Sequence, residues 1–269
     1  MFGNTGEFSL PPRGSMTLRL AGIPIQIQPL FWLVAFFFSP FLTPNHAEAD
    51  SRILFLGLLA WIAAWLLNFL IHELGHAFSA RFLYGARPRI ILYGFGGVTL
   101  WNPIYTRIPG RWGHLLIALA GPGAEIAAAL LLMSVLLICG VPMTAGWNSF
   151  GPIPIPSLSV DLESFLTESI SMAGLFGIVT LEIFLNSFIW MGFFWGILNL
   201  LPIDPLDGGH IASALFGSLF SRRGEIFAHV LSLLFAGGLA VYCLAERNYF
   251  MAFFFGLFAH HSWGNLKSA

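Results

Sequence analysis

Residues 69–78 read Phe-Leu-Ile-His-Glu-Leu-Gly-His-Ala-Phe, and this stretch decides how the rest of the chain is interpreted. On a helix, His72 and His76 lie four residues apart on one face, one above the other. That spacing lets both imidazoles bind one Zn²⁺ at about 2.0–2.1 Å, with Glu73 beside the metal as a candidate base. The sequence therefore predicts a metal site carried by a helix.

The setting of this motif is apolar, because the preceding run 53–70 contains no charged residue. Hydrophobic residues make up 57% of the chain and charged residues only 9%, whereas a soluble domain has about 25% charged residues. We therefore predict a polytopic membrane protein, in which ionisable residues inside a span mark a functional site. The formal net charge of −1 gives no indication of nucleic-acid binding.

Apolar runs of the chain predict an all-α fold of about six transmembrane helices, as one membrane-embedded domain over 1–269. The six spans are expected at 29–42, 53–80, 113–139, 172–201, 226–245 and 249–261. Short membrane-associated β-strands are expected at 16–28 and 90–101, and the glycines of the second segment favour a hairpin. The segment 140–169, rich in Pro and Gly, is expected to form a loop.

The distribution of charge predicts which ends of the helices face the cytoplasm. Segment 81–111 holds five arginines and no acidic residue, whereas 140–169 is acidic and contains no Lys or Arg. By the positive-inside rule, 81–111 and both termini are cytoplasmic, and 140–169 is external. The motif helix and the fourth span then both end near the cytosolic face. We expect a prokaryotic cell (inner) membrane as the location.

A metal site needs a third protein ligand and an open position for water. The best source is 199–209, which reads Asn-Leu-Leu-Pro-Ile-Asp-Pro-Leu-Asp-Gly-Gly. The prolines stop the helix and the glycines permit a tight turn, which leaves Asp207 facing the motif helix. Asp207 would complete a His₂Asp set. Asp204 and His210 are weaker alternatives, because each is more often a loop residue.

Taken together, these segments resemble the site-2 protease family of intramembrane zinc metalloproteases. The resemblance rests on four segments, namely 72–76 (His-Glu-Leu-Gly-His), 199–209, 22–25 (Gly-Ile-Pro-Ile) and 95–98 (Phe-Gly-Gly-Val). It implies that one Zn²⁺ per chain is bound by His72, His76 and Asp207. It also implies that Glu73 is the catalytic glutamate and that Asn199 assists near the substrate carbonyl.

The same resemblance implies a function, which is hydrolysis of peptide bonds in or near transmembrane helices of membrane-protein substrates. Cleavage would occur close to the cytosolic face of the bilayer. The chain departs from the family pattern at Glu125, where Asn is frequent, and at Gln28, where His is common. Many members of the family carry a PDZ insert or a C-terminal CBS pair. We expect this chain to be a compact member without either.

Two other functions remain open at this point, namely a zinc transporter or metal-binding membrane protein, and an inactive family member that acts as a scaffold. Glu73 and the 205–209 turn favour hydrolysis, since a transporter would spread polar residues across the membrane depth. Three polar residues in spans are also ambiguous. Asn68 either supports the site or binds a neighbouring helix, and Glu125 and Glu182 are either paired inside the bundle or support the site.

The charge distribution gives a first testable prediction. A topology reporter inserted within 140–169 should read as external, and one fused after Lys267 should read as cytoplasmic. Alkaline phosphatase and a fluorescent protein, which are active on opposite sides of the membrane, measure this directly. The reverse pattern would move the predicted metal site to the external face.

Overall fold

The computed structural model describes residues 14–39, 50–94, 96–101, 110–150, 153–166 and 172–268. This part of the chain is mostly helical. The helices are α1 (Pro29–Phe37), α2 (Ser51–Tyr84), α3 (Arg111–Ile138), α4 (Leu162–Phe165), α5 (Met172–Asn199), α6 (Asp207–Ala245) and α7 (Tyr249–Ser268). The strands are β1 (Met16–Leu20), β2 (Ile23–Ile27), β3 (Arg89–Tyr93), β4 (Gly96–Leu100), β5 (Met143–Phe150) and β6 (Ile153–Val160).

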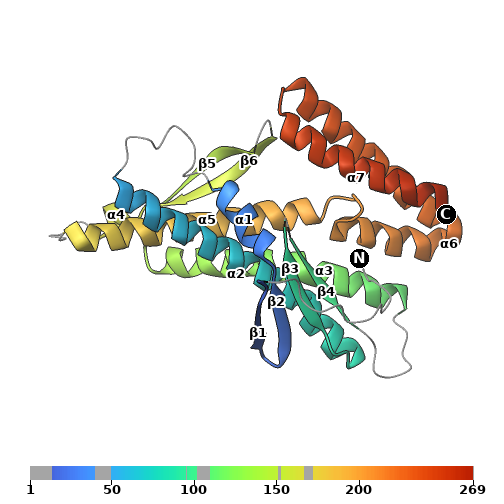
Figure 1. The fold of residues 1–269 in the computed structure, drawn as a ribbon, viewed down its shortest axis with the longest axis horizontal. Coiled ribbons are helices and arrows are strands. Elements are labelled where there is room, and N and C mark those ends of the chain that lie inside the picture. The colour runs from blue at the N-terminus through green and yellow to red at the C-terminus, as the bar shows by residue number, and fades with distance from the viewer. Residues whose placement is uncertain are drawn as a thin grey trace.

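Helices α2, α3 and α5 form the centre of the fold and contact one another. Helices α2 and α5 run in the same direction and α3 runs against them (Figure 1). Aromatic rings hold α2 to α5, since Trp195 lies 5.9 Å from Trp65 and 5.7 Å from Phe69 between ring centroids. This packing brings the C-terminal half of α2, which carries the motif, next to the C-terminal end of α5.

A four-stranded sheet covers the C-terminal half of α2 (Figure 1). Its strand order is β1-β2-β3-β4, with β2 and β3 parallel and the other two pairs antiparallel. The buried side chains of this sheet join the main core with the three helices, namely Ile23, Ile25, Ile27, Ile90 and Leu92. The strands predicted at 16–28 and 90–101 are therefore present, and they pair with each other across about 65 residues of sequence.

The segment 140–169 differs from the predicted loop. Strands β5 and β6 pair antiparallel from Met143–Val160 to Phe150–Ile153, and the short helix α4 follows. Polar side chains of α5 hold the end of this segment. Asn186 Oδ1 accepts the Val160 N–H at 2.6 Å, and Glu182 Oε2 accepts the Leu162 N–H at 2.9 Å. Glu182 is thus paired with backbone far from the motif helix, which is the structural role considered for it.

Four helices of the described chain are long and apolar enough to cross a membrane, at 51–84, 112–138, 174–199 and 223–245. The six-span prediction is not confirmed. Helix α1 has nine residues and a length of about 14 Å, which is short against a hydrocarbon core of about 30 Å. The end of that predicted span, 40–42, lies outside the described residues. Helix α7 is not among the four candidates, although it covers the predicted span 249–261.

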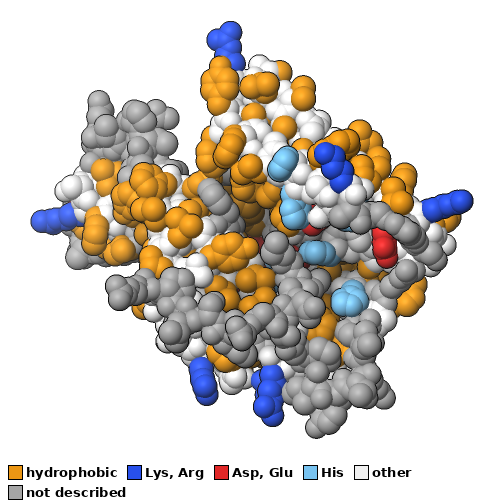
Figure 2. Space-filling model, turned by 45° about the vertical axis from the view of Figure 1, so that its right-hand side comes forward, with side chains coloured by type: hydrophobic (Ala, Val, Ile, Leu, Met, Phe, Trp, Pro, Cys, Tyr) orange, Lys and Arg blue, Asp and Glu red, His pale blue; other side chains and the backbone are white. Residues whose placement is uncertain are grey.

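Apolar side chains dominate the surface as well as the core. Figure 2 shows hydrophobic side chains over much of one face, with Lys and Arg mostly at its margins and histidines gathered in one region. Exposed large side chains include Phe55 and Leu59 on α2, Leu131 on α3, Leu234 on α6 and Phe253 on α7. Helices that are apolar on all sides are typical of a chain that is surrounded by lipid.

Candidate metal centre and active site

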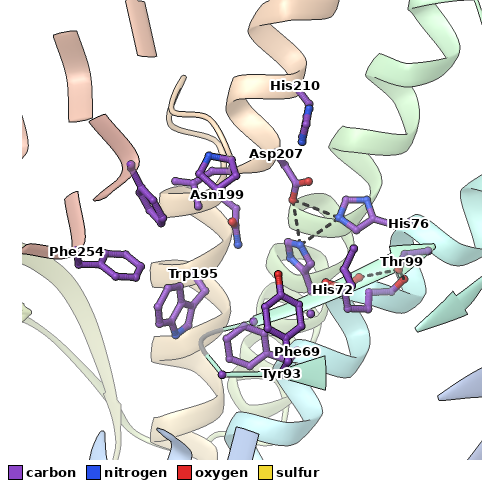
Figure 3. A pocket seen from close by; sticks show the side chains of 18 of the residues that line it. Phe69, His72, His76, Tyr93, Thr99, Trp195, Asn199, Asp207, His210 and Phe254 are labelled. Carbon is purple, nitrogen blue, oxygen red and sulfur yellow. Dashed lines mark hydrogen bonds and ion pairs between the residues drawn. The ribbon is translucent and has the colours of Figure 1, made fainter. Parts of the chain in front are cut away.

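The three predicted ligands lie together in the structure, although Asp207 is more than 130 residues away from His72 in the sequence. His72 Nε2 and His76 Nε2 are 3.1 Å apart, and Asp207 Oδ2 lies 3.0 Å from the first and 3.2 Å from the second (Figure 3). Both histidines come from α2, and Asp207 is the first residue of α6. Within the described residues, this is the group of His, Cys, Asp and Glu side chains whose geometry could hold a metal ion.

The spacing of these three donor atoms fits an ion with tetrahedral coordination. With metal–ligand bonds of about 2.0–2.1 Å, tetrahedral geometry places the donor atoms about 3.3–3.4 Å apart. The three observed separations, 3.0–3.2 Å, lie within a few tenths of an ångström of that value. Two imidazoles and one carboxylate also leave the fourth position open, which is the arrangement of catalytic rather than structural zinc sites.

The far ring nitrogens of both histidines have partners on α3. His76 Nδ1 donates to the Ile117 carbonyl oxygen at 2.7 Å, and His72 Nδ1 lies 3.0 Å from Glu125 Oε2. A carbonyl oxygen only accepts, so Nδ1 of His76 carries its proton and Nε2 presents a lone pair to the cluster. Partners of this kind fix the tautomer and orientation of metal-binding histidines. The contact with Glu125 therefore orients the ring of His72.

A glycine on α3 makes room for the histidine rings. A Cβ atom at Gly121 would lie 2.2 Å from His76 Nε2 and 2.9 Å from His72 Nε2, closer than van der Waals contact permits. Residues 121–123 read Gly-Pro-Gly. The first glycine allows α3 to pass directly over the two rings. Sequence spacing alone gave no signal that this glycine faces the motif.

Glu73 lies beside the metal-capable cluster but outside it. Its side chain is 3% exposed and lines the same pocket as His72 and His76. Thr99 of β4 donates a hydrogen bond from Oγ1 to Glu73 Oε2 at 2.6 Å. A buried carboxylate adjacent to the cluster, and not used in it, is in place to exchange protons with a bound molecule.

A pocket of about 490 Å³ opens onto this cluster and is bounded by five helices and the sheet. Strands β3 and β4 form one wall and aromatic side chains form another. The labelled residues of Figure 3 that line it include Phe69, Tyr93, Trp195, Asn199, His210 and Phe254. Burial, followed by the nearby Glu73 carboxylate, raises the pKa of Tyr93. The pocket is thus mostly apolar, with its polar groups concentrated near the three donor atoms.

The charge of Asp207 suits a metal ligand. Burial acts to raise the pKa of this carboxyl, but the nearby rings of His76 and His72 outweigh burial and hold the pKa well below its usual range. Asp207 is therefore ionised, which is the form that binds a cation.

Three of the other candidate residues lie outside the cluster. Asp204, a weaker candidate for the third ligand, binds Asn265 of α7 through its carboxylate and Ser232 of α6 through its backbone N–H. Asn68 donates to the Phe188 carbonyl oxygen of α5 at 3.3 Å, so it links two helices rather than supporting the site. His210 lines the pocket but is not part of the three-residue cluster.

Comparison with known proteins is consistent with this geometry. The sequence model described as peptidase family M50 matches residues 60–242, a range that contains the motif helix and Asp207. The chain belongs to peptidase family M50, the site-2 protease family. A solved structure, the site-2 protease from Methanocaldococcus jannaschii, is 19% identical over 94% of this chain and 95% of that chain, with a TM-score of 0.48. A comparison with curated protein sequences gives no match.

Family membership has two consequences for this chain. Together with the four apolar helices, it indicates an integral membrane protein of a protease family. The match also covers Glu73 and Asn199 as well as the three residues of the metal-capable cluster. A member of the M50 family can be inactive, so the roles of individual residues are taken up below as proposals.

The close approach of α3 to the rings leads to a prediction about Gly121. Gly121→Ala should sharply lower the zinc content of the purified M50 protein, because its Cβ would displace the His76 ring. Gly123→Ala is the matched control, since a Cβ there meets no atom within 4 Å and lies on the same turn of α3. Atomic absorption of both variants measures the effect. A Gly121→Ala protein with as much zinc as the control would contradict this geometry.

The contact between His72 and Glu125 leads to a separate prediction. Glu125→Gln should weaken zinc binding by about 10- to 100-fold, because it replaces the carboxyl partner of a ligand by an amide. Competition with a chelator of known affinity provides the measurement. Glu182→Gln, on α5 and paired with backbone far from the cluster, should leave the affinity unchanged. Equal affinities for both variants would show that Glu125 does not support His72.

Proposed function

We propose that this protein is an intramembrane zinc metalloprotease. It hydrolyses peptide bonds in or near the transmembrane helices of membrane-protein substrates, close to the cytosolic face. The observation that carries the proposal is the position of Glu73, buried beside a His₂Asp group in a pocket and held by Thr99. A site that only bound a metal would not need this additional carboxylate.

His72, His76 and Asp207 are the proposed ligands of one Zn²⁺. When bound, the ion would polarise a peptide carbonyl and lower the pKa of a water toward about 7. Glu73 accepts a proton from the attacking water and passes it to the leaving amine. Ile117 and Glu125 keep the two imidazoles oriented while this proton moves. The buried setting keeps competing water out and strengthens each of these electrostatic interactions.

Asn199 is proposed as a second polar group of the reaction. It ends α5 and lines the pocket that holds Glu73 and the cluster. Its side-chain amide can donate a hydrogen bond to the carbonyl oxygen of the substrate as negative charge develops there. This placement supports the role that the family resemblance implies for Asn199.

Strand β4 is the proposed binding place for the unwound substrate. It is the last strand of the four-stranded sheet, so one of its edges has no strand partner within the described residues. Four residues of β4 line the pocket, namely Gly96, Gly97, Val98 and Thr99. A helical substrate hides its amides in internal hydrogen bonds, and an extended segment added to the edge of β4 would expose one of them.

The orientation and location of the protein follow from the arginine distribution and stay proposals. Both termini would be in the cytoplasm, and the membrane would be a prokaryotic inner membrane. The partners are then the bilayer itself and a transmembrane protein substrate.

Substitution of Glu73 separates a protease from a zinc carrier. Glu73→Gln keeps the size of the side chain but removes its ability to accept a proton, so cleavage should fall by about 10²–10⁴-fold. Zinc content should remain near one per chain, because Glu73 is not part of the metal-capable cluster. Cleavage of a reporter transmembrane substrate in detergent or vesicles measures the first effect.

Asp207→Ala is the matched comparison, since it should lose zinc and cleavage together. The proposed function fails if Glu73→Gln cuts as fast as the wild-type protein. It also fails if the wild-type protein cuts no transmembrane substrate while it carries zinc across vesicle membranes.

A further inference from the structure

Strand β4 touches the proposed proton acceptor at two points. Thr99 Oγ1 lies 2.6 Å from Glu73 Oε2 and 3.0 Å from the Glu73 carbonyl oxygen. Two residues earlier, Gly97 passes so close to Glu73 that a Cβ there would lie 2.5–2.6 Å from the Glu73 side chain. The carboxylate of Glu73 is therefore confined by one strand, on one side by a hydrogen bond and on the other by backbone.

The hydroxyl of Thr99 has one proton, so it donates to one of its two neighbours at a time. The contact to the carboxylate is the shorter one, and a charged acceptor gives the stronger hydrogen bond. Thr99 is 5% exposed, so water does not compete freely for this proton. The bond is thus directed to Oε2 of Glu73.

The two oxygens of this carboxylate have different neighbours on β4. Thr99 binds Oε2, whereas Oε1 is among the Glu73 atoms that a Cβ at Gly97 would meet at 2.5–2.6 Å, and the side chain lines the pocket. A carboxylate that is held at one oxygen keeps one orientation. Glutamate has three side-chain torsions, so without this bond it would sample several orientations.

We propose that Thr99 is a positioning residue for Glu73, whose hydrogen bond to Oε2 holds the carboxylate in the orientation that proton transfer needs. The inference rests on the proposed function and adds a residue from the sheet to it. Thr99 is not part of the metal-capable cluster, although it lines the pocket with the other residues of β4. Loss of its hydroxyl alone should lower the rate of the chemical step rather than substrate binding, because the backbone edge of β4 is kept.

Three variants of Thr99 test this positioning role in the full-length protein. Thr99→Val keeps the shape of the side chain and removes the hydroxyl, so kcat should fall by about 10- to 100-fold. The KM for a reporter transmembrane substrate and the zinc content should stay within about 2-fold of wild type. Thr99→Ser restores a hydroxyl at the same position and should recover most of kcat.

Thr180→Val is the matched control, because it also removes a hydroxyl that donates to a carbonyl oxygen, here that of Phe176 within α5. It should leave kcat unchanged. If Thr99→Val does not accumulate in the membrane, Thr99→Ala takes its place, since it lacks the hydroxyl without adding an apolar methyl group next to the carboxylate.

Each outcome decides between positioning and a purely structural role. Wild-type kcat in the hydroxyl-free variant overturns the inference and leaves the proposed protease function standing. A change in KM or zinc content with unchanged kcat also overturns it, as does a Ser variant that is no faster than Val. If both hydroxyl-free variants fail to fold, Thr99 is structural and the inference is wrong. If the wild-type protein cuts nothing, the proposed function fails first, and the inference fails with it.

Discussion

The structure depends on one constraint, which is that polar groups buried in an apolar bundle need partners. His72, Glu73 and Glu125 are each less than 10% exposed, and an unpaired polar group in such surroundings costs several kcal/mol, roughly 2–7 by transfer measurements. The partners of His72, His76 and Glu73 lie on three other elements. Helix α3 supplies Glu125 and the Ile117 carbonyl, β4 supplies Thr99, and α6 supplies Asp207. The pairing of these polar groups thus fixes how α3, β4 and α6 pack around α2.

The members of the metal-capable cluster and the carboxylate beside it could be predicted from the sequence, because their signal is local. Two histidines at helical spacing, and an aspartate in a Pro-Gly turn, carry their chemistry in their own neighbourhoods. The prediction of Asp207 needed one further inference, namely that the motif helix and the fourth span end at the same depth in the membrane. The residues that support the site gave no such signal. Gly121 and Thr99 matter through contacts with other elements, and no spacing within 113–139 or 90–101 reveals which side chain faces the motif.

The fold shows the same division between local and distant interactions. Strand-like patterns at 16–28 and 90–101 were predicted, whereas the parallel pairing of β2 with β3 joins segments far apart in sequence. Apolar composition predicted a span at 29–42, but α1 ends at Phe37 and contributes Phe31 to the core. Segment 140–169 has the Pro and Gly content of a loop, yet its strands pair and its end binds α5. Composition could not distinguish these cases, because tertiary contacts decide them.

The separation of the cluster along the chain has a consequence for its biosynthesis. His76 and Asp207 meet only after the intervening residues have been made, and at about 5–20 residues per second this takes roughly 7–26 s. During that interval the nascent chain holds Glu73 and two histidines but lacks the carboxylate that completes the donor set. The hydrolase proposed above would be inactive while the ribosome and insertion machinery surround it. It would become competent only once the start of α6 has docked.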